Sequence, residues 1–392
     1  MKFKSFLLIS IVISSCTSDH ITNSLMIIDP PSFVGNEFKL SEISDAINYI
    51  PLDNKFPIGI IYSVKFTGNS VFLSAKDLGV IRFNREGKEP QIYGAVGRGP
   101  EEYVYCMSYA VNNKTDAVYV MDRNNVIKVF ANNGRYLKNI NLPKSKSGFC
   151  FDNIEWFNSY LFVSQNIKMG HAEYNWIILD TLGTIINRKR NSIPEFQGRE
   201  GAGGGTYTFS NKIFYWNWYN DTVFSVSENF DYKAAYLFAP GEHRFPAKAL
   251  PFVSLMQYQN LVSKYMIPKR LFETNRYIVF QYYYYLNKST ISFIEKNSGI
   301  VFLFSNENYA TVGIGNDLDN GLDFQPIGYF VEKDREFLFG LLSPYQIKAH
   351  VGTETFINSS PKYPEKKKEL EKLANSLKET DNPVLVLVRL KR

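Results

Sequence analysis

The chain has 392 residues, of which 45% are hydrophobic, 21% are charged and 16% are aromatic. This composition excludes collagen-like, disordered and multi-pass membrane proteins. The formal net charge is only +6 and the basic residues are scattered along the chain, so nothing favours a nucleic-acid partner. The high aromatic fraction favours strands.

The first 16 residues have the three parts of a bacterial export signal. Lys2 and Lys4 form a positive start, and residues 6–13 are apolar but too few to cross a bilayer, which takes about 20 residues. The small residues before Cys16 resemble the lipobox of bacterial lipoproteins, which implies that residues 1–15 are removed and that Cys16 carries acyl chains such as palmitate. A plain signal peptide with an incidental cysteine is the alternative. We therefore expect a lipid-anchored protein of the cell envelope, on the periplasmic or the surface face of the outer membrane.

Residues 16–35 are predicted to be a polar tether, with Pro30-Pro31 near its end, and residues 36–392 to form one domain. Only two further cysteines follow, Cys106 and Cys150. An exported protein can oxidise such a pair, so one disulfide and two buried free thiols are both open, and we favour the thiols.

A strand–turn–strand pattern recurs between about residues 58 and 350. In one copy, residues 118–121 and 126–130 form two strands around a turn, and Asn132-Asn133-Gly134 starts the next turn. The six copies include residues 70–88, 118–140, 161–183, 212–224, 277–300 and 327–339. Self-similarity at about 40–50 residues, with several short strands per copy, predicts an all-β fold, a six-bladed β-propeller. A β-sandwich would not explain the period, and a parallel β-helix would need shorter repeats.

Two segments interrupt this pattern. Residues 241–269 are predicted to be an insertion with a short helix, and residues 364–378 to be a helix that begins at Pro364 and carries one leucine stripe. The final run, residues 384–390, is too apolar to be left exposed. We expect it to close the ring by completing a sheet near residues 49–52.

Four short stretches carry a resemblance to a known family of proteins. They are Gly97–Tyr103, Asn220–Phe224, Glu273–Tyr277 and Asn316–Gly321. Together with the closing residues 381–386, they resemble the six-bladed β-propeller lipoproteins abundant in Bacteroides-type bacteria, a family largely of unknown function. The resemblance covers nearly the whole mature chain and implies a propeller fold and an envelope location. It implies no catalytic residues.

The candidate ligand-binding residues come from two of these stretches. Arg98, Glu102 and Tyr103 belong to the first, where Gly and Pro shape a tight turn and the charged side chains can pair or face the channel mouth. Arg276 belongs to the third. A purely structural role in linking blades is the alternative for the first stretch, and it is the interpretation we favour.

Asp317, Asp319 and Asp323 alternate along a glycine-containing turn and offer oxygen ligands to Ca²⁺. Asp also serves turns by bonding its own backbone, which is the interpretation we favour. The four histidines are widely spaced and no local zinc motif is present. Residues 201–205 are glycine-rich but lack the Lys-Ser/Thr that a phosphate loop needs, so they predict a flexible loop. We expect no cofactor, with calcium left open.

Two functional hypotheses follow. The first is a lipid-anchored binding or interaction module, with an unidentified protein or glycan ligand on one face of the propeller. The second is an enzyme, a glycan lyase or hydrolase, with carboxylates from different blades at the channel mouth. We favour the binding module. A funnel lined by convergent charged and tyrosine side chains would favour the enzyme, whereas a flat apolar rim would favour a protein partner.

Overall fold

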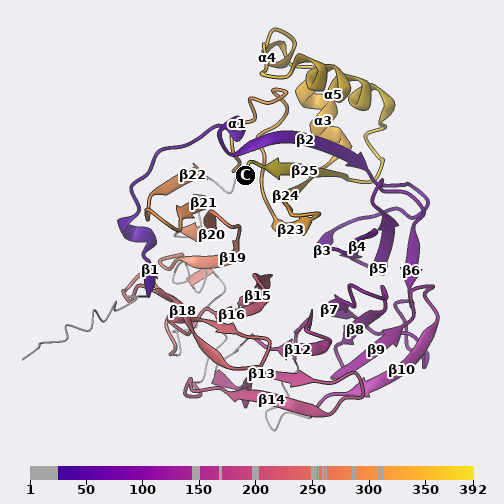
Figure 1. Cartoon of the computed structure of the whole chain (residues 1–392), viewed down its shortest axis with the longest axis vertical. Coiled ribbons are helices and arrows are strands. Elements are labelled where there is room, and N and C mark those ends of the chain that lie inside the picture. The colour runs from indigo at the N-terminus through magenta and orange to yellow at the C-terminus, as the bar shows by residue number, and fades with distance from the viewer. Residues whose placement is uncertain are drawn as a thin grey trace, which may run out of the picture.

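The computed structural model describes residues 25–143, 151–166, 170–196, 203–248, 263–284, 288–307 and 312–392, with a few single residues between 254 and 260. Its strands form six sheets arranged in a ring (Figure 1), five of them four-stranded and one five-stranded. The predicted six-bladed β-propeller is therefore confirmed. In blades 1–5 the first of four consecutive strands lies nearest the centre of the ring (Figure 1), and the other three follow outward as antiparallel neighbours.

The first five blades each use four consecutive strands. Blade 1 contains β3 (Ile61–Phe66), β4 (Ser70–Ala75), β5 (Gly79–Asn84) and β6 (Gln91–Tyr93), and blade 2 contains β7 (Cys106–Val111), β8 (Val118–Asp122), β9 (Val126–Phe130) and β10 (Tyr136–Asn141). Blade 3 contains β11 (Asn153–Phe157), β12 (Tyr160–Ser164), β13 (Tyr174–Leu179) and β14 (Ile185–Arg190). Blade 4 contains β15 (Gly204–Phe209), β16 (Lys212–Asn217), β17 (Thr222–Val226) and β18 (Tyr232–Phe238), and blade 5 contains β19 (Ile267–Glu273), β20 (Tyr277–Tyr284), β21 (Lys288–Glu295) and β22 (Val301–Glu307).

Blade 6 closes the ring by combining the two ends of the chain. It contains β23 (Gly328–Glu332), β24 (Arg335–Leu342), β25 (Val384–Leu390) and β2 (Ser44–Pro51), in the order β2-β25-β24-β23. β25 pairs antiparallel with β2, from Ser44 opposite Leu390 to Pro51 opposite Val384. The prediction that residues 384–390 complete a sheet near residues 49–52 is confirmed. An interior strand between two blades buries both of its faces, which is why the run is apolar throughout.

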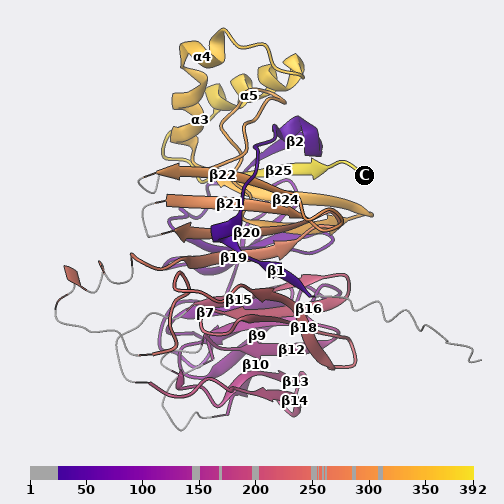
Figure 2. The same cartoon turned by 90° about the vertical axis from the view of Figure 1, so that its left-hand side faces the viewer.

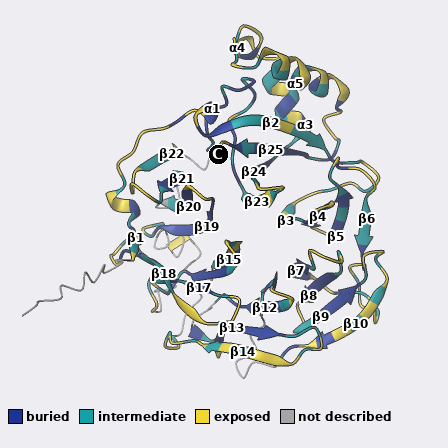
Figure 3. Cartoon of the chain, viewed as in Figure 1, coloured by how far each residue is buried: buried dark blue, intermediate teal, exposed yellow. Residues whose placement is uncertain are grey.

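The core lies between neighbouring blades. β13 is buried along its whole length, whereas the outermost strand of the same blade, β14, is largely exposed (Figure 3). Cys106, at the start of β7, is a buried free thiol, and burial raises its pKa to about 12. Its counterpart in the disulfide alternative, Cys150, lies outside the described residues.

The described part of the expected tether follows the outside of the ring (Figure 1). β1 (Met26–Ile28) pairs parallel with β18 and adds a fifth strand to blade 4. A short 3₁₀ turn, η1 (Pro30–Ser32), follows, Asn36 bridges to Phe302 of β22, and α1 (Leu40–Ile43) leads into β2. Residues 25–35, expected in the tether, thus form a strap, because the free edge of β18 offers backbone partners and Ile28 is fully buried.

Three helices occupy the connection between β24 and β25. They are α3 (Pro344–Val351), α4 (Glu354–Ile357) and α5 (Pro364–Ser376). α5 is the helix expected over residues 364–378, whereas α3 and α4 were not predicted. A capping box starts α3, since the Ser343 hydroxyl accepts from the Gln346 backbone N–H at 3.2 Å and the Ser343 N–H donates to the Gln346 side chain.

The expected insertion over residues 241–269 lies partly outside the described residues. Of its described part, Arg244 forms an isolated bridge with Met266, and β19 begins at Ile267. The expected glycine-rich loop at residues 201–205 is likewise described only from residue 203, and Gly204 and Gly205 belong to β15.

The two faces of the ring carry connections of different length. Cys106 at the start of β7 pairs with Asp122 at the end of β8, so the connection 94–105 and the turn 123–125 lie on the same face. This long-loop face carries the described parts of the links between blades and the helical connection, namely 52–60, 94–105, 142–143, 151–152, 191–196, 203, 239–248, 263–266, 312–327 and 343–383. The opposite, short-turn face carries tight hairpin turns such as 158–159, 210–211 and 333–334. Figure 2 shows α3 and α4 toward one face and the C-terminus toward the other.

Candidate functional site

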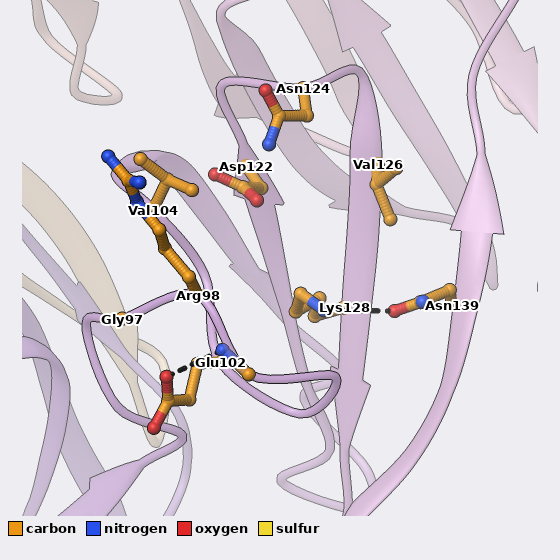
Figure 4. Close-up of a pocket in the computed structure, with 10 residues that line it drawn as sticks. Gly97, Arg98, Glu102, Val104, Asp122, Asn124, Val126, Lys128 and Asn139 are labelled. Atoms are coloured by element: carbon orange, nitrogen blue, oxygen red, sulfur yellow. Dashed lines mark hydrogen bonds between the residues drawn. The ribbon is translucent and has the colours of Figure 1, made fainter.

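A pocket of about 480 Å³ opens on the long-loop face, between blade 2 and the connection that reaches it from blade 1 (Figure 4). This connection, residues 94–105, contains the first candidate stretch of the sequence analysis. The pocket is lined by Gly97, Arg98, Gly99, Glu102, Val104, Asp122, Asn124, Val126, Lys128 and Asn139. Two of the predicted ligand-binding residues, Arg98 and Glu102, therefore lie together on its wall.

The connection folds back on itself through its own backbone. The Gly97 N–H donates to the Tyr103 carbonyl at 3.0 Å, and the Tyr103 N–H donates to the Ala95 carbonyl at 3.1 Å. The Glu102 carboxylate accepts the Gly99 N–H through Oε2 at 2.7 Å. A Cβ on Gly97 would lie 2.0 Å from that same Oε2, so any other residue there would displace the Glu102 carboxylate from this position. Glu102 thus shapes the loop with one carboxylate oxygen and leaves Oε1 outside that bond.

Tyr103, the third predicted residue, lies beneath the pocket and is fully buried. Its hydroxyl donates to the Tyr93 carbonyl at 2.9 Å and accepts the Val80 N–H at 3.1 Å. Burial raises the pKa of this phenol, so it stays neutral. Tyr103 fastens the connection to blade 1 and does not line the pocket.

Two buried charged residues fasten the connection to blade 2. Asp122, 3% exposed, accepts the backbone N–H groups of Tyr105 and Arg123 through Oδ1, at 3.2 and 2.7 Å. Lys128, 6% exposed, donates from Nζ to the Pro100 carbonyl at 2.7 Å. Sequence reasoning missed both residues, because they lie on hairpin strands that are far from the motif along the chain.

Other polar groups of the pocket are not used to hold its walls. Arg98 and Asn124 are exposed, and neither makes a hydrogen bond or an ion pair within the part of the chain that the structure describes. The pocket therefore contains two cations, Arg98 and Lys128, against two carboxylates, Glu102 and Asp122. Its formal charge is balanced, and its free donors and acceptors lie side by side.

An exposed aromatic pair borders the pocket. Tyr105 follows the pocket residue Val104 directly, and its ring centroid lies 6.3 Å from that of Tyr62 on the inner strand of blade 1. The two side chains are 43% and 47% exposed. A side-chain hydrogen bond with Tyr62 is the largest cause of the raised pKa of Tyr105. We call Ile60, Tyr62, Val96, Val104 and Tyr105 the aromatic rim; all five are exposed large hydrophobic residues.

Polar side chains of the inner strands meet across the channel. Lys65 of blade 1 forms an ion pair with Glu155 of blade 3, and both are about one-fifth exposed. Asn153 of blade 3 donates to the Thr206 hydroxyl of blade 4 at 2.5 Å, and that hydroxyl donates to Glu155. The carboxylate of Glu155 is therefore held by a cation and a hydroxyl from two other blades, an arrangement that ties blades together.

Asp152 lies next to this network, directly before Asn153, the first residue of β11. Both of its carboxylate oxygens accept the Asn166 N–H, at 3.1 Å each. Burial nevertheless raises the pKa of Asp152 to about 7, since the charged form is poorly hydrated there.

Arg276, the remaining predicted ligand-binding residue, lies on the short-turn face. It belongs to the turn between β19 and β20, its Nε donates to Glu295 at 2.6 Å, and its guanidinium lies 5.0 Å from the centroid of the Tyr277 ring. The structure therefore separates Arg276 from Arg98 and Glu102.

The three aspartates of the calcium hypothesis do not converge. Asp317 accepts the backbone N–H and the hydroxyl of Ser41, at 2.9 and 2.7 Å, which fastens α1. Asp319 is fully buried and accepts the Gly321 N–H at 2.8 Å, whereas Asp323 is exposed. Among the described residues, no group of three His, Cys, Asp or Glu side chains has a geometry that could hold a metal ion. Asp317 and Asp319 thus bond backbone N–H groups of α1 and of the turn.

Two solved structures from Bacteroides are similar to this chain over most of its length. A putative exported protein from Bacteroides fragilis is 16% identical, with a TM-score of 0.67 over 94% of this chain and 100% of that chain. A member of the DUF4221 family from Bacteroides vulgatus is 10% identical, with a TM-score of 0.50 over 89% of this chain and 97% of that chain. At these identities the likeness shows the fold alone. No curated protein matches the chain.

Within the described residues, no helix has the length and apolar character needed to cross a membrane. The model of one protein family, described as a domain of unknown function (DUF4934), matches residues 25–389. The match begins where the strap begins and ends within β25, so it includes both chain ends that close the ring. This six-bladed β-propeller belongs to the DUF4934 family.

Proposed function

We propose that the protein is a lipid-anchored binding module of the cell envelope that holds its ligand in the pocket between blades 1 and 2. The observation that carries the proposal is that some polar side chains of this site hold the pocket walls, whereas others remain available to a ligand. Tyr103, Asp122 and Lys128 are buried and their hydrogen bonds hold the walls of the pocket. Arg98 and Asn124, in contrast, make no hydrogen bond with any described residue. A preformed cavity with a few unengaged polar groups is what small-ligand sites have in common.

The anchor is proposed at Cys16, which lies outside the described residues, and the support for it is the sequence of residues 1–16. β1 runs parallel to β18, and β18 runs from the short-turn face at Tyr232 to the long-loop face at Phe238. β1 therefore runs in the direction from the short-turn face to the long-loop face. If the anchor lies on the side of the short-turn face, the pocket is turned toward solvent, where a ligand can reach it.

A retention experiment on the full-length chain tests the binding proposal. The protein is dialysed to equilibrium against a defined mixture of oligosaccharides, short peptides and inorganic anions, and the retained compounds are identified by mass spectrometry. The pocket variant is Arg98→Ala combined with Asn124→Ala, both exposed positions whose loss leaves the fold intact. The matched control is Arg276→Ala, which removes an exposed arginine from the opposite face.

We expect the wild type and Arg276→Ala to retain the same compound, and the pocket variant to retain at least about tenfold less of it. Retention of nothing by the wild type contradicts the proposal. Equal retention by all three proteins also contradicts it, because the bound compound would then lie elsewhere.

A further inference from the structure

We infer that the ligand of the pocket is a neutral oligosaccharide, with one sugar unit among the polar groups and a neighbouring unit on the tyrosines of the aromatic rim. This inference rests on the proposed function, because it assigns a chemical class to the same site. Three features of the site carry it: the balance of charge, the mixture of donors and acceptors, and the exposed rings at the border.

The charge balance argues against an anionic ligand. Lys128 is buried and already donates to the Pro100 carbonyl, so Arg98 is the cation left free to meet a ligand. The carboxylates of Glu102 and Asp122 line the same pocket. A phosphate, sulfate or carboxylate in the pocket would therefore meet two carboxylates as well as two cations, so the charges of the pocket give an anion no net attraction.

The remaining polar atoms suit hydroxyl groups. The Arg98 guanidinium donates, Glu102 Oε1 and Asp122 Oδ2 accept, and the Asn124 amide does both. A hydroxyl is at once a donor and an acceptor, so adjacent hydroxyls of one sugar can bond the guanidinium and a carboxylate together. A ligand with acceptors only would leave both carboxylates without a partner.

The aromatic rim supplies the surface for the apolar face of a sugar ring. Tyr62 and Tyr105 are each nearly half exposed, although ring residues of this size are usually buried more deeply in a folded domain. Their ring centroids lie 6.3 Å apart, within the range of packed aromatic pairs, so each ring supports the other before any ligand arrives. A pyranose presents C–H groups on its faces and hydroxyls at its edge, so its face can cover tyrosine while its edge reaches polar groups.

The backbone of the site argues against a peptide that binds as an added strand. This mode of binding needs free N–H and C=O groups along a strand edge. In the connection 94–105, the backbone groups of Ala95, Gly97 and Tyr103 already bond each other. The pocket therefore offers side chains, and not an open edge, to its ligand.

The test is binding of the full-length chain to an array that carries neutral glycans, sulfated glycans and short peptides. The variants are Tyr105→Ala and Tyr105→Phe, and the matched control is Tyr345→Ala, which removes a 60% exposed tyrosine from α3. We expect binding to neutral glycans, a loss of about tenfold or more in Tyr105→Ala, and no loss in Tyr345→Ala. Tyr105→Phe keeps the ring and should retain most of the binding. If Tyr105 acted only through a structural role of its hydroxyl, Tyr105→Phe would lose binding as Tyr105→Ala does.

The outcomes separate the ligand class from the site itself. Binding only to sulfated glycans or to peptides overturns the saccharide inference, and it leaves the binding module standing if the Arg98 and Asn124 double variant loses that signal. Equal binding of neutral glycans by wild type and Tyr105→Ala also overturns the inference. Absence of any signal on the array, together with no retention in dialysis, overturns both proposals.

Discussion

Leu385 joins the last blade of the ring to the first. It lies on β25, is 1% exposed, and packs with Val71 of blade 1 and with Phe339 of β24. Its neighbours Val386 and Val388 point to the other side and pack in the core that blade 6 shares with blade 5. We predict that Leu385→Ala destabilises the whole propeller while leaving its backbone pairings with Ile50 and Leu341 in place.

The expected magnitude follows from the burial of this side chain. A leucine that is removed from a well-packed core costs about 2–5 kcal/mol, because the apolar contact is lost and a cavity remains. The free energy of unfolding of a domain is about 5–15 kcal/mol, so the effect is easily measured. Val331→Ala is the matched control, since Val331 is 56% exposed on β23 of the same blade and should cost at most about 0.5 kcal/mol.

Urea unfolding with two signals measures both the size and the reach of the effect. Far-ultraviolet circular dichroism reports on all strands. Tryptophan fluorescence reports on blades 3 and 4, because these blades hold the four tryptophans, Trp156, Trp176, Trp216 and Trp218. Blades 3 and 4 lie across the ring from β25 (Figure 1). A ring that is closed by β25 should unfold as one unit, so both midpoints should fall together.

Two results would refute this reasoning. If circular dichroism shifts and the fluorescence midpoint does not, blade 6 unfolds alone and β25 does not hold the ring. If Leu385→Ala matches Val331→Ala in both signals, the packing of β25 between blades contributes no stability.

Three further predictions address the ring, the channel and the anchor. The Arg85 guanidinium lies 5.0 and 4.9 Å from the ring centroids of Phe66 and Phe330 and pairs with Glu332 at 2.7 Å. Arg85→Ala should therefore lower the free energy of unfolding, measured by urea denaturation, by about 1–2 kcal/mol. An unchanged urea midpoint would disprove the role of Arg85 in joining blades 1 and 6. Asp152, with its pKa raised from 3.8 to about 7, binds its proton more tightly in the folded state, so the stability it contributes is present below pH 4 and lost as the pH rises to 7. Asp152→Asn should therefore gain melting temperature relative to wild type between pH 4 and 7, and parallel curves would contradict this. Cys16→Ser should move the protein from the membrane fraction to the soluble fraction, and unchanged retention would refute lipidation.

The blades could be predicted from the sequence because each is a local unit. Alternating apolar residues and turn residues recur within 40–50 residues, so the strands of blades 1–5 are visible without knowledge of long-range pairing. β25 was predictable for a different reason, since a run such as residues 384–390 has to be buried on both faces. The helix α5 was predictable because Pro364 suits its first turn and its leucines form one apolar stripe.

The features that escaped prediction depend on partners far away in the chain. β1 has only three residues, and it is a strand because the edge of β18 lies beside it in the folded ring. α3 had a local signal, the spacing of Ser343, Pro344 and Gln346, which marks a capping box. The missed helix was therefore within reach of sequence reasoning, whereas the strap was not.

The pocket was predictable only in part for the same reason. Arg98 and Glu102 could be predicted as site residues because glycines and charged residues occur together in the short motif at residues 97–103. Asp122 and Lys128 belong to a hairpin of blade 2, and the tyrosine pair joins Tyr62 of blade 1 to Tyr105. Arg276 was predicted from the family resemblance, which does not indicate on which face of the ring a residue lies. The pairing of β19 with β20 places Arg276 on the short-turn face, opposite the pocket.

Hydrogen–deuterium exchange of the full-length chain tests the location of the ligand most directly, with and without the compound that is retained in dialysis. The account predicts slower exchange in two segments, residues 94–105 and 122–126, which form the connection and the hairpin around the pocket. It predicts no change in the turn at residues 274–276 on the short-turn face. Protection of that turn, or of neither pocket segment, would contradict a ligand site between blades 1 and 2.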